Sequence, residues 1–153
     1  MSPFGRFELE ETRFSFDISS LQPLTYGMPV SYSGKVSGYF PVSLFNKNDY
    51  IGINGRLSLS DLTVTLSQQQ TLGDFIIDFR AEKEGMTSGK IKDSGGILSV
   101  DGKLSLTKNG LISASAMLAP REPDRSLQRV LLFLGRPDSR GYTQFNNQFK
   151  LWK

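Results

Sequence analysis

Alternation of apolar and polar residues with a period of two runs through most of this chain and restricts its fold more than any other feature. Phe14, Phe16 and Ile18 alternate with polar neighbours, and the stretch 72–81 repeats the pattern. Successive side chains of a β-strand point to opposite faces, so this spacing predicts strands with one apolar and one polar face. Turn signals between the strands favour an all-β fold. We predict a mainly β domain spanning 1–153, a curved antiparallel meander sheet that forms a partial barrel or a sandwich.

The alternation changes sides or is interrupted at three places. A flip near Glu11 and Thr12 predicts a bulge or a tight turn there, because the apolar face of a strand cannot change sides otherwise. A second flip falls at Ser60 and Asp61. Pro41 interrupts another alternating stretch, where it fits an edge or bulged position.

Two stretches between the predicted strands have the composition of turns. The segment 20–29 contains two prolines and a glycine and is predicted to be a loop. Lys108-Asn109-Gly110 separates two alternating runs and predicts a tight β-hairpin.

One segment near the end follows a helical period, over residues 124–134. Its apolar face comprises Leu127, Val130, Leu131 and Leu134. Asp124 or Ser126 can cap the first turn, and Gly135 and Pro137 can end the helix. Alternation resumes after the helix, so the sequence predicts a short amphipathic helix that covers the open end of the sheet.

The residue types exclude most catalytic and metal chemistry. The chain contains no Cys and no His, which removes thiolate ligands, Cys nucleophiles and the commonest general base. The segment 85–90 has the wrong glycine spacing for a phosphate loop, and Asp93-Ser94-Gly95-Gly96 has the composition of a turn. Glu8 and Glu10 are spaced as solvent-facing strand residues. We predict no catalytic residue, no metal site, no cofactor and no enzymatic activity.

Charge and hydropathy limit the partners. The net charge is +3, and the cations are spread along the chain rather than concentrated in one stretch, so we predict no nucleic-acid binding. No apolar run approaches the roughly 20 residues that span a bilayer.

A short segment after the predicted helix offers the candidate partner-binding residues Phe133, Arg136 and Asp138. Phe133 lies off the apolar helix face, so it is either additional core or an exposed anchor for a partner. Asp138 and Arg136 flank Pro137, and they either stabilise a turn and the helix end or form an exposed polar knob that docks another protein.

Three motifs in the second half of the chain resemble the type II secretion system protein N family. They lie at 101–104, within the pattern L-x-G-x-L-x-L, at Ala119-Pro120-Arg121, and at 131–141, where "LGRPD" follows the helix. The resemblance is best over 50–152 and is similar to the C-terminal part of such proteins. Some relatives carry a cysteine pair that this chain lacks.

The resemblance implies a periplasmic domain that is held at the bacterial inner membrane by an N-terminal anchor missing from this chain. It also implies other secretion-system components as partners. The style of the sheet is similar to that of AsmA-like proteins, whose curved grooves line lipid paths.

Two functions therefore stand as hypotheses. The favoured one is a non-enzymatic accessory or assembly component of the secretion system that acts through protein contacts, including pairing at exposed strand edges. The alternative is a lipid-binding groove. Small residues such as Ala114 and Ala116 facing Phe side chains would indicate a filled interior, and Phe on both walls without a filler would indicate a groove.

Overall fold

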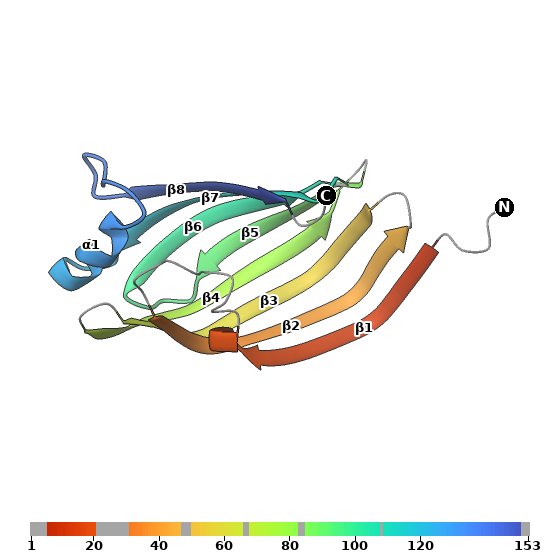
Figure 1. Cartoon of the computed structure of the whole chain (residues 1–153), viewed down its shortest axis with the longest axis horizontal. Helices are drawn as coiled ribbons and strands as arrows, with labels where there is room; N and C mark the ends of the chain where they lie inside the picture. Colours follow the sequence, from red (N-terminus) through yellow and green to blue (C-terminus); the bar gives the residue numbers. More distant parts are fainter. Residues whose placement is uncertain are drawn as a thin grey trace.

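The computed structural model describes residues 6–20, 31–46, 50–65, 68–82, 85–107 and 109–150. Its strands are β1 (Arg6–Asp17), β2 (Ser31–Asn46), β3 (Tyr50–Thr65), β4 (Gln69–Ala81), β5 (Thr87–Asp93), β6 (Leu98–Leu106), β7 (Leu111–Pro120) and β8 (Thr143–Lys150). They form one antiparallel sheet in sequence order (Figure 1). Within the described residues β1 and β8 pair with no further strand, so the sheet stays open. The predicted mainly β meander is confirmed, as an open curved sheet.

The interruptions of the alternation lie at backbone irregularities inside continuous strands. Glu11 has a left-handed backbone (φ 51°), and Glu10 and Thr12 on either side of it pair with Val42 and Phe40. Position 11 therefore stands opposite Pro41, which has no N–H to donate. The register of β2 against β3 shifts at the same level. Pro41 thus occupies a bulge in an inner strand, and β1 passes Glu11 without a tight turn.

A second irregularity keeps the apolar side chains of β3 on one face. Asp61 has φ 54°, and the pairing of β3 with β4 shifts between Leu59 and Leu62. The carboxylate of Asp74 accepts the Asp61 N–H at 2.8 Å. Because the extra residue absorbs the change of parity, Leu59 and Leu62 pack against the same core.

The hairpin between β6 and β7 is confirmed at the predicted place. The Gly110 N–H donates to the Thr107 carbonyl at 2.9 Å, and Gly110 has φ 77°, a conformation that glycine adopts without a steric penalty. Lys108 lies outside the described residues, as does the predicted loop over 20–29 apart from its first position.

The helix α1 (Arg125–Leu132) lies between β7 and β8 in the chain and at one end of the sheet (Figure 1). Asp124 is its N-cap, and its carboxylate accepts the Leu127 N–H at 3.0 Å. A second oxygen of Asp124 accepts a hydrogen bond from the Gln70 side chain at 3.1 Å, which ties the cap to β4. The predicted short amphipathic helix is confirmed, with Asp124 rather than Ser126 as its cap.

The hydrophobic core lies beneath this helix. Leu127 is fully buried and Leu131 nearly so. They pack against the buried strand residues Val64, Leu72, Phe75, Leu98, Val100 and Leu118. Leu134 was predicted on the same helix face but is exposed, because the helix ends at Leu132 and the chain turns away before position 134 completes another turn.

Candidate functional site

The end of α1 presents three consecutive exposed apolar side chains, which we name the α1 tip: Leu132, Phe133 and Leu134. Their exposed fractions are 56%, 61% and 42%. Leu127 and Leu131 lie on the face of the helix that packs into the core. Leu132 and Phe133 lie on other sides of the helix axis and therefore face solvent. Phe133 therefore lies outside the core, and the interpretation of this residue as additional core is wrong.

The chain after the tip forms a tight turn organised by Asp138. One carboxylate oxygen accepts the backbone N–H groups of Arg140 and Tyr142 at 2.8 and 3.0 Å. The other accepts the Arg140 guanidinium at 3.2 Å. The hydrogen bond from Tyr142, together with those from Arg140, holds the pKa of Asp138 below its ordinary value. Asp138 is thus used within the turn, as the structural reading of the sequence predicted.

Arg136 is exposed, and no ion pair of it is found within the described part of the chain. The carbonyls of Val130 and Leu131 accept backbone N–H groups of residues 133–135, so they do not depend on the Arg136 side chain. Of the three predicted partner-binding residues, Phe133 and Arg136 are therefore available to a partner, and Asp138 shapes the turn beside them.

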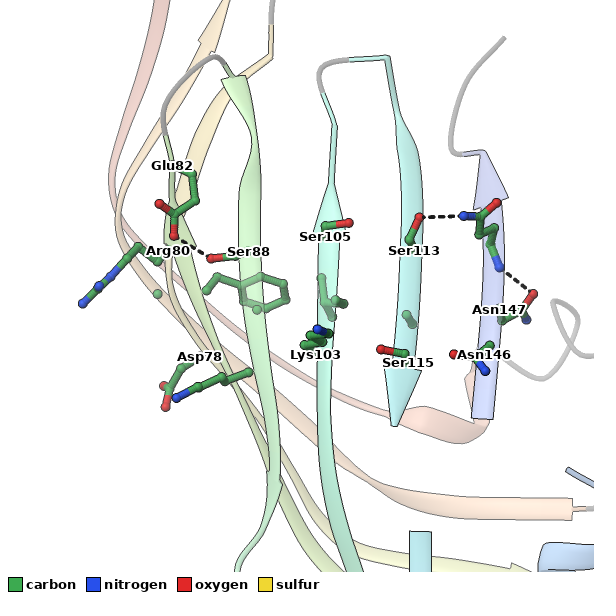
Figure 2. A pocket seen from close by; sticks show the side chains of 17 residues that line it. Asp78, Arg80, Glu82, Ser88, Lys103, Ser105, Ser113, Ser115, Asn146 and Asn147 are labelled. Carbon is green, nitrogen blue, oxygen red and sulfur yellow. Dashed lines mark hydrogen bonds between the residues drawn. The ribbon is translucent and has the colours of Figure 1, made fainter. Parts of the chain in front are cut away.

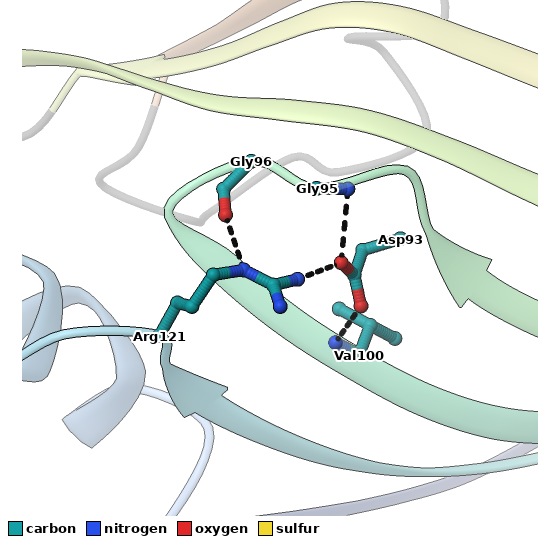
Figure 3. Close-up of polar contacts among 5 residues, drawn as sticks. All are labelled: Asp93, Gly95, Gly96, Val100 and Arg121. Carbon is teal, nitrogen blue, oxygen red and sulfur yellow. Dashed lines mark hydrogen bonds and ion pairs between the residues drawn. The ribbon is translucent and has the colours of Figure 1, made fainter.

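An ion pair that the sequence analysis missed anchors this end of the molecule. Arg121, just after β7, reaches the turn between β5 and β6, where it donates to the Gly96 carbonyl at 2.9 Å and contacts the Asp93 carboxylate (Figure 3). Asp93 also accepts the N–H groups of Gly95 and Val100. Twenty-eight positions separate the two partners, so no local spacing could have revealed the pair.

The surroundings of Asp93 favour its charged form. Burial raises the pKa of this carboxyl, but the hydrogen bonds from Val100 and Gly95 and the positive charge of Arg121 outweigh that effect and hold the pKa below its ordinary value. The pair fixes the segment that leads from β7 into α1, so the α1 tip is presented on a rigid support.

The apolar face of the sheet continues beyond α1, toward β1. The rings of Phe14 and Phe16, of Phe14 and Phe40, and of Phe40 and Phe79 each lie 5.9 Å apart between centroids. Phe14 and Phe16 are 37% exposed. We call these four residues the aromatic row; the helix does not cover it.

Two glycines leave space for the rings of the aromatic row. A Cβ atom at Gly38 would lie 2.4 Å from the ring of Phe14, and one at Gly55 would lie 2.5 Å from the ring of Phe40. Side chains at these two positions would therefore displace the rings.

The sequence analysis took small residues that face Phe side chains as the sign of a filled interior. This criterion has different outcomes at Ala116 and Ala114. Ala116 pairs with Phe145, and both pack against the core beneath α1, so that end is filled. At the other end Ala114 stands between Leu104 and Asn147 in register, with no Phe opposite it. The criterion for a filled interior is thus met at Ala116 and not at Ala114.

The strands β3 to β8 also border a cavity of about 1260 Å³ (Figure 2). Its lining includes Phe79, Leu104 and Ala114 from the apolar face of the sheet, together with polar residues such as Lys103 and Ser105. Within the described ranges no group of three acidic side chains could hold a metal ion. None of the helices in the part of the chain that the structure describes is both long and apolar enough to span a bilayer.

Comparison with known proteins adds one positive finding. The family model described as type II secretion system (T2SS), protein N, matches residues 1–146, which adds the residues before position 50 to the region of resemblance. Comparisons with curated proteins and with solved structures gave no match. The match covers nearly the whole chain, and the chain belongs to the type II secretion system protein N family.

Proposed function

We propose that this protein is a non-enzymatic accessory or assembly component of the type II secretion system that works through protein contacts in the periplasm. Family membership supports the assignment to the secretion system. The observation that carries the proposed mode of action is the α1 tip, where Leu132, Phe133 and Leu134 expose a continuous apolar surface. Exposed aromatic side chains are typical anchors of protein interfaces.

The support beneath the tip suits a binding role. Asp124 caps α1, and Leu127 and Leu131 pack against the sheet. Arg121, before the helix, forms an ion pair with Asp93. A partner that binds this tip loses little conformational freedom in the process, because the surface is already ordered. Arg136 adds a cation that can pair with an acidic group of the partner, and Asp138 holds the turn in shape.

The open edges of the sheet offer a second mode of contact with secretion components. β1 and β8 have unpaired outer sides within the described residues, so either can accept a strand from a partner. In our proposal the protein acts on the periplasmic side of the inner membrane, beside the other components of the secretion system.

Photocrosslinking in secreting cells tests the role of the tip. A photoreactive amino acid at position 133 should crosslink a secretion-system protein, and Phe133→Ser should reduce export of a secreted substrate severalfold. Ile97→Ser is the matched control, because Ile97 is also an exposed apolar residue but lies outside the tip. Equal secretion by the Phe133→Ser variant and the wild type, with no crosslinked partner, would contradict the proposal.

The aromatic row favours the alternative of a lipid-handling groove. Phe14, Phe16, Phe40 and Phe79 form a partly exposed apolar surface on which an acyl chain could lie. Native mass spectrometry of protein purified from bacteria, followed by lipid extraction, tests this function. A co-purifying species of acyl-chain mass that is lost in Phe79→Asp and kept in Ile97→Asp supports the groove, and a clean apo mass counts against it.

A further inference from the structure

The two edge strands of the sheet differ in the features that discourage pairing with another strand. Half of the twelve residues of β1 are charged, and the left-handed backbone of Glu11 interrupts its edge. Charges and bulges of this kind keep edge strands from pairing with other chains. β8 lacks these features, since it carries no charged residue, proline or glycine from Thr143 to Phe149. Of the two edges, that of β8 is therefore the better suited to accept a strand.

Two hydrogen bonds show which residues of β8 direct their backbone groups away from β7. Before the strand, the Tyr142 carbonyl accepts the N–H of Asp138, which lies in the segment between α1 and β8. Near the other end, the Gln148 N–H donates to the side chain of Asn147 at 2.8 Å. Backbone groups of successive residues alternate between the two sides of a strand, so the even-numbered residues of β8 face away from β7.

The segment after α1 already covers the beginning of this outer edge. Pro137 forms an isolated bridge with Thr143. Beyond it, Asn146, Gln148 and Lys150 are exposed, and within the described residues no further strand pairs with this side of β8. The part of the edge that is left open is therefore centred on Gln148.

Two β8 strands fit together in antiparallel orientation about a two-fold axis at Gln148. Gln148 then stands opposite Gln148 of the second copy, and Asn146 stands opposite Lys150. Each of these residues can exchange backbone hydrogen bonds with its counterpart. Like charges do not meet, because Lys150 stands opposite an amide side chain. Even-numbered residues pair with even-numbered ones, so the polar faces of the two sheets are continuous, and so are the apolar faces.

The position of α1 is compatible with this arrangement. The helix lies at the end of the sheet where β8 begins (Figure 1). In an antiparallel pair the two strands begin at opposite ends, so the helices of the two copies lie apart and both α1 tips stay exposed. In the pair, a backbone carbonyl of the second copy takes the place of the Asn147 side chain as acceptor of the Gln148 N–H.

We propose that β8 pairs with β8 of a second copy of this chain, so that two copies share one continuous sheet. Each copy contributes the same surface to such a contact, and the association therefore stops at two copies. The inference goes beyond the function proposed above and does not depend on it. It assigns the β8 edge to self-association and leaves β1 and the α1 tip to secretion components.

Single cysteines test the register, because the chain contains no cysteine of its own. Gln148→Cys places the two thiols opposite each other, so a short bis-maleimide should link the copies severalfold more efficiently than in Ser15→Cys, the matched control on β1. Equal crosslinking of the two variants would overturn the assignment to β8. Crosslinks between Gln148→Cys and Ser15→Cys in a mixture, exceeding those of Gln148→Cys alone, would indicate that β8 pairs with β1 and would also overturn it.

Charge variants measured by sedimentation equilibrium separate the pairing of β8 from other self-association. Gln148→Lys and Gln148→Glu each place like charges opposite each other, so each variant alone should dimerise about fivefold more weakly than the wild type. In an equimolar mixture opposite charges face each other, and dimerisation should return to the strength of the wild type. A wild-type chain that stays monomeric would overturn the proposal and leave the edge to a strand of another protein. Wild-type dimerisation in both separate variants, or failure of the mixture to restore it, would also overturn the proposal.

Discussion

The two ends of the apolar face differ in burial although the same alternation builds both. At the α1 end Phe75 is 7% exposed, and the helix covers it with Leu127. Along the aromatic row Phe14 is 37% exposed, with other rings as its neighbours. The comparison teaches that an alternating strand specifies which face is apolar, and that a separate element decides whether that face becomes core or surface.

Replacing buried and half-exposed rings is expected to show the largest difference. Phe75→Ala should lower the free energy of unfolding by about 3–5 kcal/mol, because it leaves a cavity in the packed core. Phe14→Ala should cost about 1 kcal/mol, because much of that ring already contacts water. Urea unfolding monitored by circular dichroism measures both, and similar losses would mean that the two ends are equally packed.

The helix itself provides the next contrast. Leu127→Ala should cost about 2–5 kcal/mol, since this side chain is fully buried beneath α1. Leu132→Ala, five positions further along the helix and exposed, should change stability by less than about 0.5 kcal/mol. A large loss on truncation of Leu132 would indicate that the tip is part of the core, which would remove the basis of its proposed binding role.

Removal of the N-cap side chain tests how much the cap contributes to the stability of the helix. Asp124→Ala should lower the free energy of unfolding by about 1 kcal/mol, because the Leu127 N–H loses its acceptor and Gln70 loses its partner. Ser126→Ala is the control in the same turn. Hydrogen exchange should become faster in α1 and remain unchanged along β1 and β2. An equal increase of the exchange rate in α1 and along β1 and β2 would contradict the difference between the two ends of the apolar face.

Acid should weaken the helix end through Asp93. The pKa of this carboxyl is lower in the folded chain than its ordinary value of 3.8, so its contribution to stability is present above that value and is lost as pH falls below it. The stability difference between the wild type and Asp93→Asn should therefore shrink on acidification. Chemical unfolding between about pH 6 and pH 2 measures it, and a difference that stays constant with pH would contradict the assigned cause.

The elements that the sequence predicted share a local cause. The meander follows from alternation, the helix from the spacing of Leu127, Val130 and Leu131, and the breaks in alternation from Pro41 and Asp61. Each depends on neighbours within a few positions, which the sequence displays directly. Exposure of Leu134 was mispredicted, because the spacing of apolar residues does not show at which residue a helix ends.

The candidate site was predicted in part. Phe133, Arg136 and Asp138 were found from their positions after the helix, and the turn formed by Asp138 follows from its own sequence neighbours. The clamp of Arg121 on Asp93 was missed. It depends on how the ends of β5 and β7 are placed relative to each other, which single-residue composition does not encode.

By itself the sequence determined that this chain forms a meander of alternating strands with one amphipathic helix near its end, because strand and helix periods arise from backbone geometry and the local order of apolar residues. The tertiary structure alone decided which part of the apolar face the helix covers, that Phe133 faces solvent, and that Arg121 pairs with Asp93. The physical reason is that burial and charge pairing depend on distances between segments far apart in the chain, and those distances exist only once the sheet has curved and its register is fixed.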